Sequence, residues 1–244
     1  MRKYVMVLLS IIVFMIACSH DSPDNNGNNN PPPPPPPPAF SNRILMLGRS
    51  VMGGWFSHWG DWQHVTRDGY ELFYGEMDSP PEIANSAIRI INQRNVDATW
   101  AVFFKFCFVD FDVYSQQEAQ QRLNENKALL EQVRQEVRTN KKAYLIIGTA
   151  LPEVSENSNQ HIKWLHQQFN SWVKTLPPTD SRIKVFDLHA FLVDGNGNLR
   201  NDYKAGNYDS HLNNKAYNAL DQQFFPFLHA NVLAYRQVLP VGIR

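Results

Sequence analysis

The sequence is poor in cysteine and lacks the motifs that identify most cofactor sites. Among its 244 residues only Cys18 and Cys107 are cysteines, so a disulfide is excluded if Cys18 is modified. No Gly-x-Gly-x-x-Gly or Walker loop follows a predicted strand, and no His-Glu-x-x-His run occurs. His161 and His166 are five residues apart, which turns them about 140° from each other on a helix. We therefore expect neither a metal nor another cofactor.

The sequence also has no excess of charge of one sign. It contains 23 basic and 23 acidic residues, for a formal net charge of zero. No basic cluster indicates nucleic acid as a partner. Its apolar fraction of 43% and aromatic fraction of 12% suffice for one well-packed core in a chain of this length.

The long apolar run lies at the N-terminus. Arg2-Lys3 precedes apolar residues 5–16, a segment too short to span a bilayer comfortably, so residues 1–17 are predicted to be an export signal. Met15-Ile16-Ala17-Cys18 resembles a bacterial lipobox, which implies that Cys18 carries lipid and anchors an exported protein to a membrane. Because Ser19 follows, the resemblance points to the outer membrane. An ordinary signal peptide with an incidental cysteine is the alternative.

A tether is predicted between this signal and the folded part. Residues 18–39 combine a polar, Asn-rich stretch with eight consecutive prolines at 31–38. Such prolines adopt the polyproline II conformation, which rises about 3.1 Å per residue and makes a stiff spacer of roughly 25 Å. A proline-rich ligand for another module is the less favoured interpretation. Residues 40–244 are then one globular domain.

Within that domain, predicted strands alternate with predicted helices. Apolar or β-branched runs indicate five strands, at 44–47, 71–77, 99–106, 144–147 and 183–187. Apolar residues with helical spacing indicate helices that start after Pro80-Pro81 and at 116–138, 159–174 and 213–232, whereas 56–68 is predicted as a helix start followed by a loop. This alternation predicts an α/β fold with a mainly parallel, five-stranded sheet covered by helices on both faces.

The first predicted strand leads into the stretch on which the functional prediction rests. Residues 44–47 are followed by Gly48, Arg49, Ser50 and then Gly53-Gly54. Ligands of open α/β sheets bind at the carboxyl ends of the strands, where Ser50 would lie. A serine hydroxyl becomes a good nucleophile only when a base removes its proton. A glycine-rich turn without chemistry is the alternative interpretation.

Two short motifs in this order resemble those of the SGNH (GDSL-type) hydrolases. Gly48-Arg49-Ser50 stands where the family has Gly-Asp-Ser, and Asp209-Ser210-His211-Leu212-Asn213 matches its late Asp/His block. The resemblance covers most of residues 43–228 and implies a flavodoxin-like, three-layer α/β/α fold. It also implies that Ser50 is the nucleophile and His211 the general base of an acyl-enzyme mechanism.

The acid that would orient His211 is less clearly marked. The family places it three residues before the histidine, where this chain has Tyr208, whereas Asp209 lies two residues before. We choose Asp209 as the orienting acid. Asp187 and Asp202 remain rivals, and a Ser-His dyad that uses a backbone carbonyl is also open.

The oxyanion donors depart furthest from the family pattern. The resemblance implies the backbone N–H of Ser50 as one donor and Gly75, after the second strand, as another. The family's Gly-x-Asn-Asp is replaced by Cys107-Phe108-Val109-Asp110, so the asparagine donor is missing. Lys105 is our candidate to replace it, with a surface lysine as the alternative. Asp110 would brace the loop, and Cys107 is expected to be a buried, inert thiol.

Aromatic residues and histidines follow the predicted nucleophile. Trp55, His58, Trp62 and His64 would line a sugar- or acyl-binding cleft, although packing in the core explains them equally well.

We thus expect a monomeric, lipid-anchored serine esterase that acts on acyl groups, acetyl above all, of carbohydrate in the cell envelope. An O-acetyltransferase with the same residues and a non-catalytic glycan-binding lipoprotein are the alternatives.

Overall fold

The structure is a computed structural model that describes residues 41–233. The predicted export signal at 1–17, the tether at 18–39 and the lipidation site Cys18 lie outside the described residues. Within residues 41–233, no helix has both the length and the apolar character that crossing a membrane requires.

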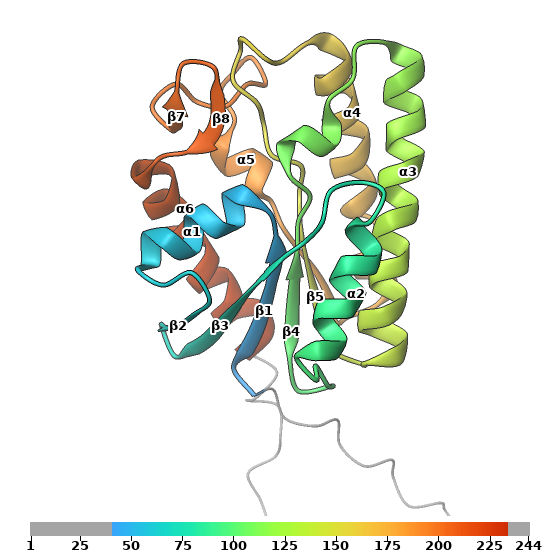
Figure 1. The fold of residues 1–244 in the computed structure, drawn as a ribbon, viewed down its shortest axis with the longest axis vertical. Helices are drawn as coiled ribbons and strands as arrows, with labels where there is room; N and C mark the ends of the chain where they lie inside the picture. The colour runs from blue at the N-terminus through green and yellow to red at the C-terminus, as the bar shows by residue number, and fades with distance from the viewer. Residues whose placement is uncertain (1–40, 234–244) are drawn as a thin grey trace, which may run out of the picture. The chain divides into compact units, whose positions relative to one another are not determined.

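A six-stranded sheet in the order β2-β3-β1-β4-β5-β6 forms the centre of the domain (Figure 1). Its strands are β1 (Arg43–Gly48), β2 (His64–Arg67), β3 (Tyr70–Glu76), β4 (Ala101–Phe104), β5 (Tyr144–Gly148) and β6 (Ile183–Phe186). All neighbours pair in parallel except β2, which is antiparallel to β3. The predicted mainly parallel sheet is confirmed, but the predicted number of five strands is wrong by one.

The additional strand is β2, in the segment predicted as a helix start and loop. Its four residues are largely exposed and show no apolar alternation, so the sequence carries no strand signal there. The turn that joins β2 to β3 consists of Asp68 and Gly69, both with positive φ, which suits a tight hairpin. Pairing with β3, rather than side-chain burial, therefore makes this edge strand.

Helices cover both faces of the sheet, as a three-layer α/β/α fold requires. They are α1 (Ser50–Trp59), α2 (Ile83–Gln93), α3 (Gln116–Arg134), α4 (Gln160–Val173), α5 (Leu188–Leu192) and α6 (Asn214–Leu228). Alternate residues of each strand serve the two faces: Leu45 and Leu47 pack with α2, α3 and α4, whereas Ile44 and Met46 pack with α1, α5 and α6. The predicted helix at 116–138 ends as an α-helix at Arg134 and continues as a π-helical turn.

The parallel strands end at one edge of the sheet, the upper edge in Figure 1. Three connections begin there: the one from β1 into α1, the one from β4 into the 3₁₀ helix η1 (Phe108–Phe111), and the one from β5 toward α4. A small hairpin, β7 (Lys204–Gly206) and β8 (Asp209–Leu212), lies at the same end and leads into α6. This hairpin was not predicted, and it brings the late Asp/His block to the edge where Ser50 lies.

Candidate active site

Ser50 is the first residue of α1 and is exposed to solvent. Gly48 closes β1 just before it, and a Cβ atom at Gly48 would lie 2.6 Å from Cβ of Met52, so only glycine permits so tight a strand-to-helix turn. The first N–H groups of a helix have no partner within it. The backbone N–H of Ser50 is therefore free to bind an oxyanion, as the resemblance implied.

His211 and Asp209 lie on β8 and are held together by two hydrogen bonds. Nδ1 of His211 lies 2.5 Å from Oδ1 of Asp209, and the backbone N–H of His211 donates to the same oxygen at 2.9 Å. The side chains of residues two apart on a strand point to the same side. The two-residue spacing of Asp209 and His211 differs from the three-residue spacing of the family, and it lets both side chains meet on β8. Burial raises the pKa of Asp209, but the hydrogen bonds from His211 outweigh it and lower the pKa below its ordinary value.

Ser50 and His211 line the same cavity, of about 470 Å³. Its wall is completed by residues of α1, the following loop, β8 and α6, namely Gly54, Ser57, His58, Trp62, Leu212, Asn214 and Tyr217. Among the described residues, Ser50 Oγ has one polar neighbour, Sγ of Cys107 at 3.9 Å, and it makes no hydrogen bond to the His211 ring. Catalytic hydrogen bonds are often long or absent without a ligand, so the shared cavity is the relevant geometry.

The cavity depends on the close approach of α1 and α6. Gly54 faces Tyr217, and a Cβ atom at Gly54 would lie 2.2 Å from the Tyr217 hydroxyl oxygen. That hydroxyl donates to the carbonyl of Val51 at 3.0 Å. Nδ1 of His58 lies 3.2 Å from the side-chain oxygen of Asn214, a second link between the two helices. Gly54 therefore serves the packing of α1 against α6 beside Ser50.

The rival acids are engaged elsewhere. Asp187 caps α5, accepts a hydrogen bond from Thr149 at 3.0 Å and forms an ion pair with Lys174 at 2.5 Å. Asp202 pairs with Arg200 and Lys215. Of the three carboxylates, Asp209 is the one that contacts His211.

The two other oxyanion candidates do not line this cavity. Gly75 lies inside β3, in register with Leu47, where a Cβ atom would also meet Ile90 at 2.9 Å. Lys105 follows β4 and is 1% exposed, so the alternative of a surface lysine is wrong. Its ammonium group donates to the carbonyl of Phe106 at 3.4 Å, and burial lowers its pKa. Their roles as oxyanion donors remain predictions.

The loop at residues 107–110, which stands where the family has Gly-x-Asn-Asp, contacts the residue before Ser50 through an ion pair. The Asp110 carboxylate accepts a hydrogen bond from the backbone N–H of Cys107 at 2.7 Å and forms an ion pair with Arg49. Val109 is exposed and supplies no donor, in keeping with its apolar side chain. Asp110 thus braces the loop, and its ion-pair partner Arg49 stands where the family has an acidic residue.

The aromatic residues and histidines after Ser50 divide into two groups. His58 and Trp62 line the cavity, and Trp62 is 61% exposed. Trp55 is buried in the core and donates to Asp221 at 2.7 Å, so its predicted place in the cleft is wrong. His64 lies on β2, stacked on Phe73 with ring centroids 4.5 Å apart.

Two neighbours of Ser50 and His211 could not be foreseen from the sequence. The buried thiol of Cys107 contacts Ser50, and the Phe108 ring packs edge-on against His211, with ring centroids 5.2 Å apart. Both belong to the loop after β4, whose apolar residues look like ordinary core residues in the sequence.

Within residues 41–233, no cluster of three or more histidine, cysteine or acidic side chains is arranged to hold a metal ion.

The fold is the one found in GDSL-type lipolytic proteins. The sequence matches no protein-family model and is similar to no curated protein. Among solved structures, a candidate acylhydrolase from Bacteroides fragilis superposes with a TM-score of 0.56 at 14% identity, over 80% of this chain and 91% of that one. A GDSL-like lipase from Bacteroides thetaiotaomicron superposes with a TM-score of 0.52 at 13% identity, over 78% and 88%. The three-layer SGNH-type fold expected from the two motifs is confirmed.

Proposed function

We propose that this protein is a serine esterase of SGNH type that acts through an acyl-enzyme intermediate. The observation that carries the proposal is the shared cavity. The exposed Ser50 and the imidazole of His211, which is bonded to Asp209, line the same cavity at the carboxyl edge of the sheet. The fold of this chain is also that of solved GDSL-like lipases. Serine, histidine and acid in this order and place are what nucleophilic acyl transfer requires.

The proposed reaction has two steps, acylation of Ser50 and hydrolysis of the acyl-serine, and His211 first accepts and then donates a proton in each. Because Nδ1 of His211 is bound to Asp209, Nε2 is the nitrogen that takes the proton from Ser50 as Oγ bonds to the ester carbonyl carbon. The backbone N–H of Ser50 stabilises the oxyanion. The carbon–oxygen ester bond then breaks, and His211 returns the proton to the departing alcohol. Water repeats the sequence on the acyl-serine and releases the carboxylic acid.

The substrate that we propose is an O-acyl, chiefly O-acetyl, ester of carbohydrate. The cavity is open and has polar groups from Ser57, His58 and Asn214 that suit a hydroxyl-rich leaving group. Trp62 at its rim offers an exposed flat ring. Aromatic rings with polar groups around them are typical of sites where one part of the ligand is apolar and another part is solvated.

Hydrolysis of p-nitrophenyl acetate tests the chemistry. Ser50→Ala and His211→Gln should each lower kcat/KM by about 10³-fold or more, because each removes a group that the acyl transfer needs. Ser181→Ala is the control for the serine, since Ser181 precedes β6 at the opposite edge of the sheet. His229→Gln is the control for the histidine, because His229 also forms a carboxylate pair, with Asp68 at 2.6 Å. Equal background rates in all five proteins would refute the esterase proposal.

We also propose that lipid on Cys18 anchors the domain to a membrane, with residues 18–39 as the spacer. The support is the lipobox-like sequence Met15-Ile16-Ala17-Cys18 and the proline run that follows it. Radiolabelled palmitate supplied to expressing bacteria should enter the wild-type protein but not Cys18→Ala, and fractionation should place the wild type in the outer membrane. Equal labelling of both proteins would refute the anchor.

A further inference from the structure

A second cavity, of about 320 Å³, lies beside the one that holds Ser50, and we call it the acidic groove. The residues that carry the argument are Phe108, Asp112, Tyr114, Glu153 and Asn157, all of which line it. Phe108 separates the two cavities, because its ring also packs against His211. A substrate bound to Ser50 could therefore extend past Phe108 into this groove.

The segment after β5, which supplies Glu153 and Asn157 to the groove, is hydrogen-bonded to the β7–β8 hairpin that carries Asp209 and His211. The side-chain amide of Asn157 donates to the carbonyl of Tyr208 at 3.0 Å, and the backbone N–H of Val154 donates to the Ser210 hydroxyl at 3.1 Å. Ser210 stands between Asp209 and His211. The groove and the catalytic histidine thus share one rigid support.

A buried acid in the groove has an oxygen without a partner. Glu153 is 3% exposed, and its Oε1 makes no hydrogen bond in the structure. The Glu153 side chain shares a hydrogen bond with the side chain of Asp112. A buried oxygen without a partner is costly, so a ligand that donates a hydrogen bond there would gain what the folded protein lacks.

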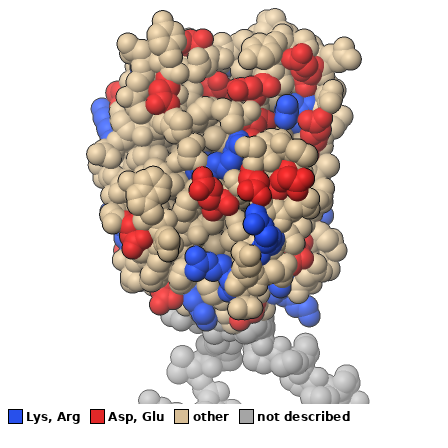
Figure 2. Space-filling view, viewed as in Figure 1, with Lys and Arg blue, Asp and Glu red and all other residues tan. Residues whose placement is uncertain are grey.

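The charge of the groove excludes one class of ligand. Asp112 and Glu156 supply negative charge to its lining, which contains neither lysine nor arginine, although Lys204 approaches Glu156 at 3.5 Å. Figure 2 shows more acidic than basic side chains on the upper half of the same view of the molecule. Anionic ligands, such as polyuronates and acidic lipid headgroups, would be repelled.

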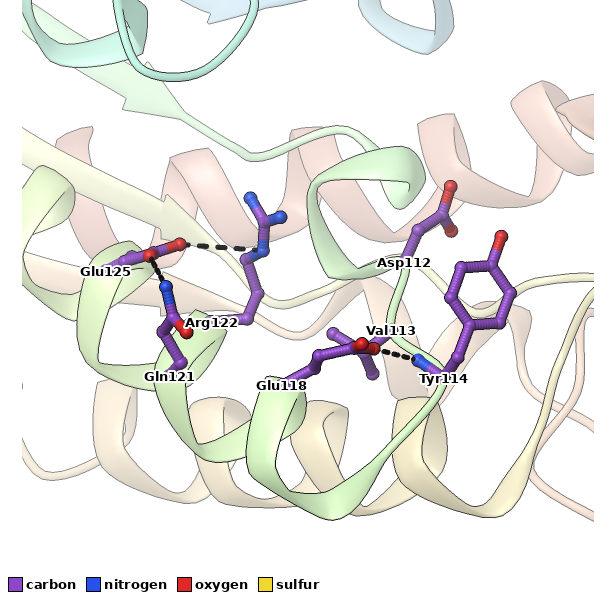
Figure 3. Close-up of a pocket in the computed structure, with 7 residues that line it drawn as sticks. All are labelled: Asp112, Val113, Tyr114, Glu118, Gln121, Arg122 and Glu125. Carbon is purple, nitrogen blue, oxygen red and sulfur yellow. Dashed lines mark hydrogen bonds and ion pairs between the residues drawn. The ribbon is translucent and has the colours of Figure 1, made fainter.

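An aromatic ring stands at the mouth of the groove. Tyr114 is 84% exposed. Figure 3 draws another pocket that Asp112 and Tyr114 also line, and it shows the Tyr114 ring and the Asp112 carboxylate pointing the same way out of the segment that precedes α3. Four large apolar side chains of residues 41–233 are exposed. Trp62 lies in the loop after α1, Val109 and Tyr114 lie in the connection after β4, and Tyr208 lies in the β7–β8 hairpin. Exposed rings beside hydrogen-bond acceptors fit a ligand with apolar faces and many hydroxyl donors.

We propose that the acidic groove binds a sugar unit of a neutral, hydroxyl-rich glycan, with Glu153 and Asp112 accepting its hydroxyl hydrogens and Tyr114 packing on its ring face. This proposal deepens the proposed esterase function and rests on it for the identity of the substrate. Neutral glycans are the ligand class that combines hydroxyl donors with no negative charge.

Direct binding tests the groove without relying on catalysis. Isothermal titration of the whole protein with xylohexaose, mannohexaose and cellohexaose should detect binding of at least one, and trigalacturonate should bind about tenfold more weakly or not at all. Tyr114→Ala and Glu153→Leu should each weaken binding of the hexasaccharide by about tenfold, because each removes a group that contacts it. Tyr114→Phe, which keeps the ring, and Glu153→Gln, which keeps an acceptor oxygen, should not. Glu136→Leu is the control, because Glu136 is also a buried acid but belongs to the π-helical turn after α3.

The outcomes separate this proposal from the esterase proposal. If no neutral hexasaccharide binds, if the groove variants bind it as the wild type does, or if phosphatidylcholine vesicles bind and the sugars do not, the groove proposal is overturned. If binding behaves as expected while p-nitrophenyl acetate hydrolysis is at background, the groove stands and the esterase fails. With an acetylated neutral oligosaccharide as substrate, Tyr114→Ala should raise KM.

Discussion

The guanidinium group of Arg49 forms an ion pair with the buried carboxylate of Asp110, which in turn accepts the backbone N–H of Cys107. One carboxylate therefore joins the residue before Ser50 to the loop that contacts Ser50. Asp110 is 1% exposed, and burial raises its pKa, whereas Arg49 and the Cys107 N–H lower it. The charge on Asp110 is tolerated because these partners surround it.

Removing either member of this pair should destabilise the protein and disturb the nucleophile. Loss of one partner leaves a buried charge uncompensated, which costs about 3–5 kcal/mol. Arg49→Ala should therefore lower the free energy of unfolding by about that amount, because it leaves the buried Asp110 carboxylate without its counter-ion. Asp110→Ala should lower it by less, because the remaining Arg49 is partly exposed and also bonds Ser79. Urea denaturation of both single variants and the double variant measures this.

The double variant is the control for the pair. If Arg49 and Asp110 stabilise each other, the double variant loses less stability than the sum of the two single variants. Strict additivity would contradict the pairing. Arg49→Asp, which restores the family's residue, should be the least stable protein because it places two carboxylates together.

Asp209 should matter to kcat and not to the fold. Asp209→Asn leaves His211 free to adopt the wrong tautomer, and we expect a fall in kcat of about 10²-fold or more with little change in unfolding free energy. Asp187→Asn and Asp202→Asn are the matched controls, because neither carboxylate contacts His211. Steady-state kinetics of the three variants with p-nitrophenyl acetate decides, and an equal or larger fall in either control would reassign the acid.

Much of the site was predictable because its signals are local. The apolar run before Gly48, and the glycines after Ser50, mark a strand that turns into a helix within a few residues. The sequence favours Asp209 but leaves Asp187 and Asp202 as rivals, because the choice depends on β8 being a strand that turns residues 209 and 211 to one side. Nothing in the four residues of β8 indicates a strand until they pair with β7.

Strand pairing, which the sequence does not show, also explains why β2 and the acidic groove could not be predicted. β2 has no apolar face and exists through its hydrogen bonds to β3, so composition does not predict it. The acidic groove joins Asp112 and Glu153 from two connections that follow β4 and β5. Only the parallel sheet order brings those connections together.

Cys107 should act through its size. Its thiol fills the space beside Ser50 Oγ and is 3% exposed, so Cys107→Ala should retain most activity with a stability loss of about 1 kcal/mol. Cys107→Leu adds atoms that must displace Ser50 or the loop, and it should lower kcat/KM by about tenfold or more and cost about 1–3 kcal/mol. Kinetics and urea denaturation of both variants check this. A fully active Cys107→Leu would show that the thiol does not limit the position of the nucleophile.

Glu153 should make the stability of the protein fall as pH rises. Burial, and then the facing Asp112 carboxylate and its hydrogen bond, raise the pKa of Glu153 from 4.5 to about 8. Burial also raises the pKa of Asp112, with Glu153 and Arg122 acting against it. Between pH 4.5 and about 8, the unfolded chain has lost the Glu153 proton and the folded protein still holds it. The free energy of unfolding then decreases by up to about 1.4 kcal/mol per pH unit, and the decrease ends above the folded pKa.

Glu153→Gln removes this titration, so it should be more stable relative to the wild type at pH 8 than at pH 5. Urea denaturation at pH 5, 6.5 and 8 measures the difference, and Glu118→Gln, which removes an exposed carboxylate of the same face, should follow the wild type at each pH. The amide keeps the shape of the side chain, so a difference that grows with pH reports the proton and not the packing. If the difference between Glu153→Gln and the wild type stays constant from pH 5 to 8, Glu153 is ionised in the folded protein throughout, and the shared proton with Asp112 does not exist.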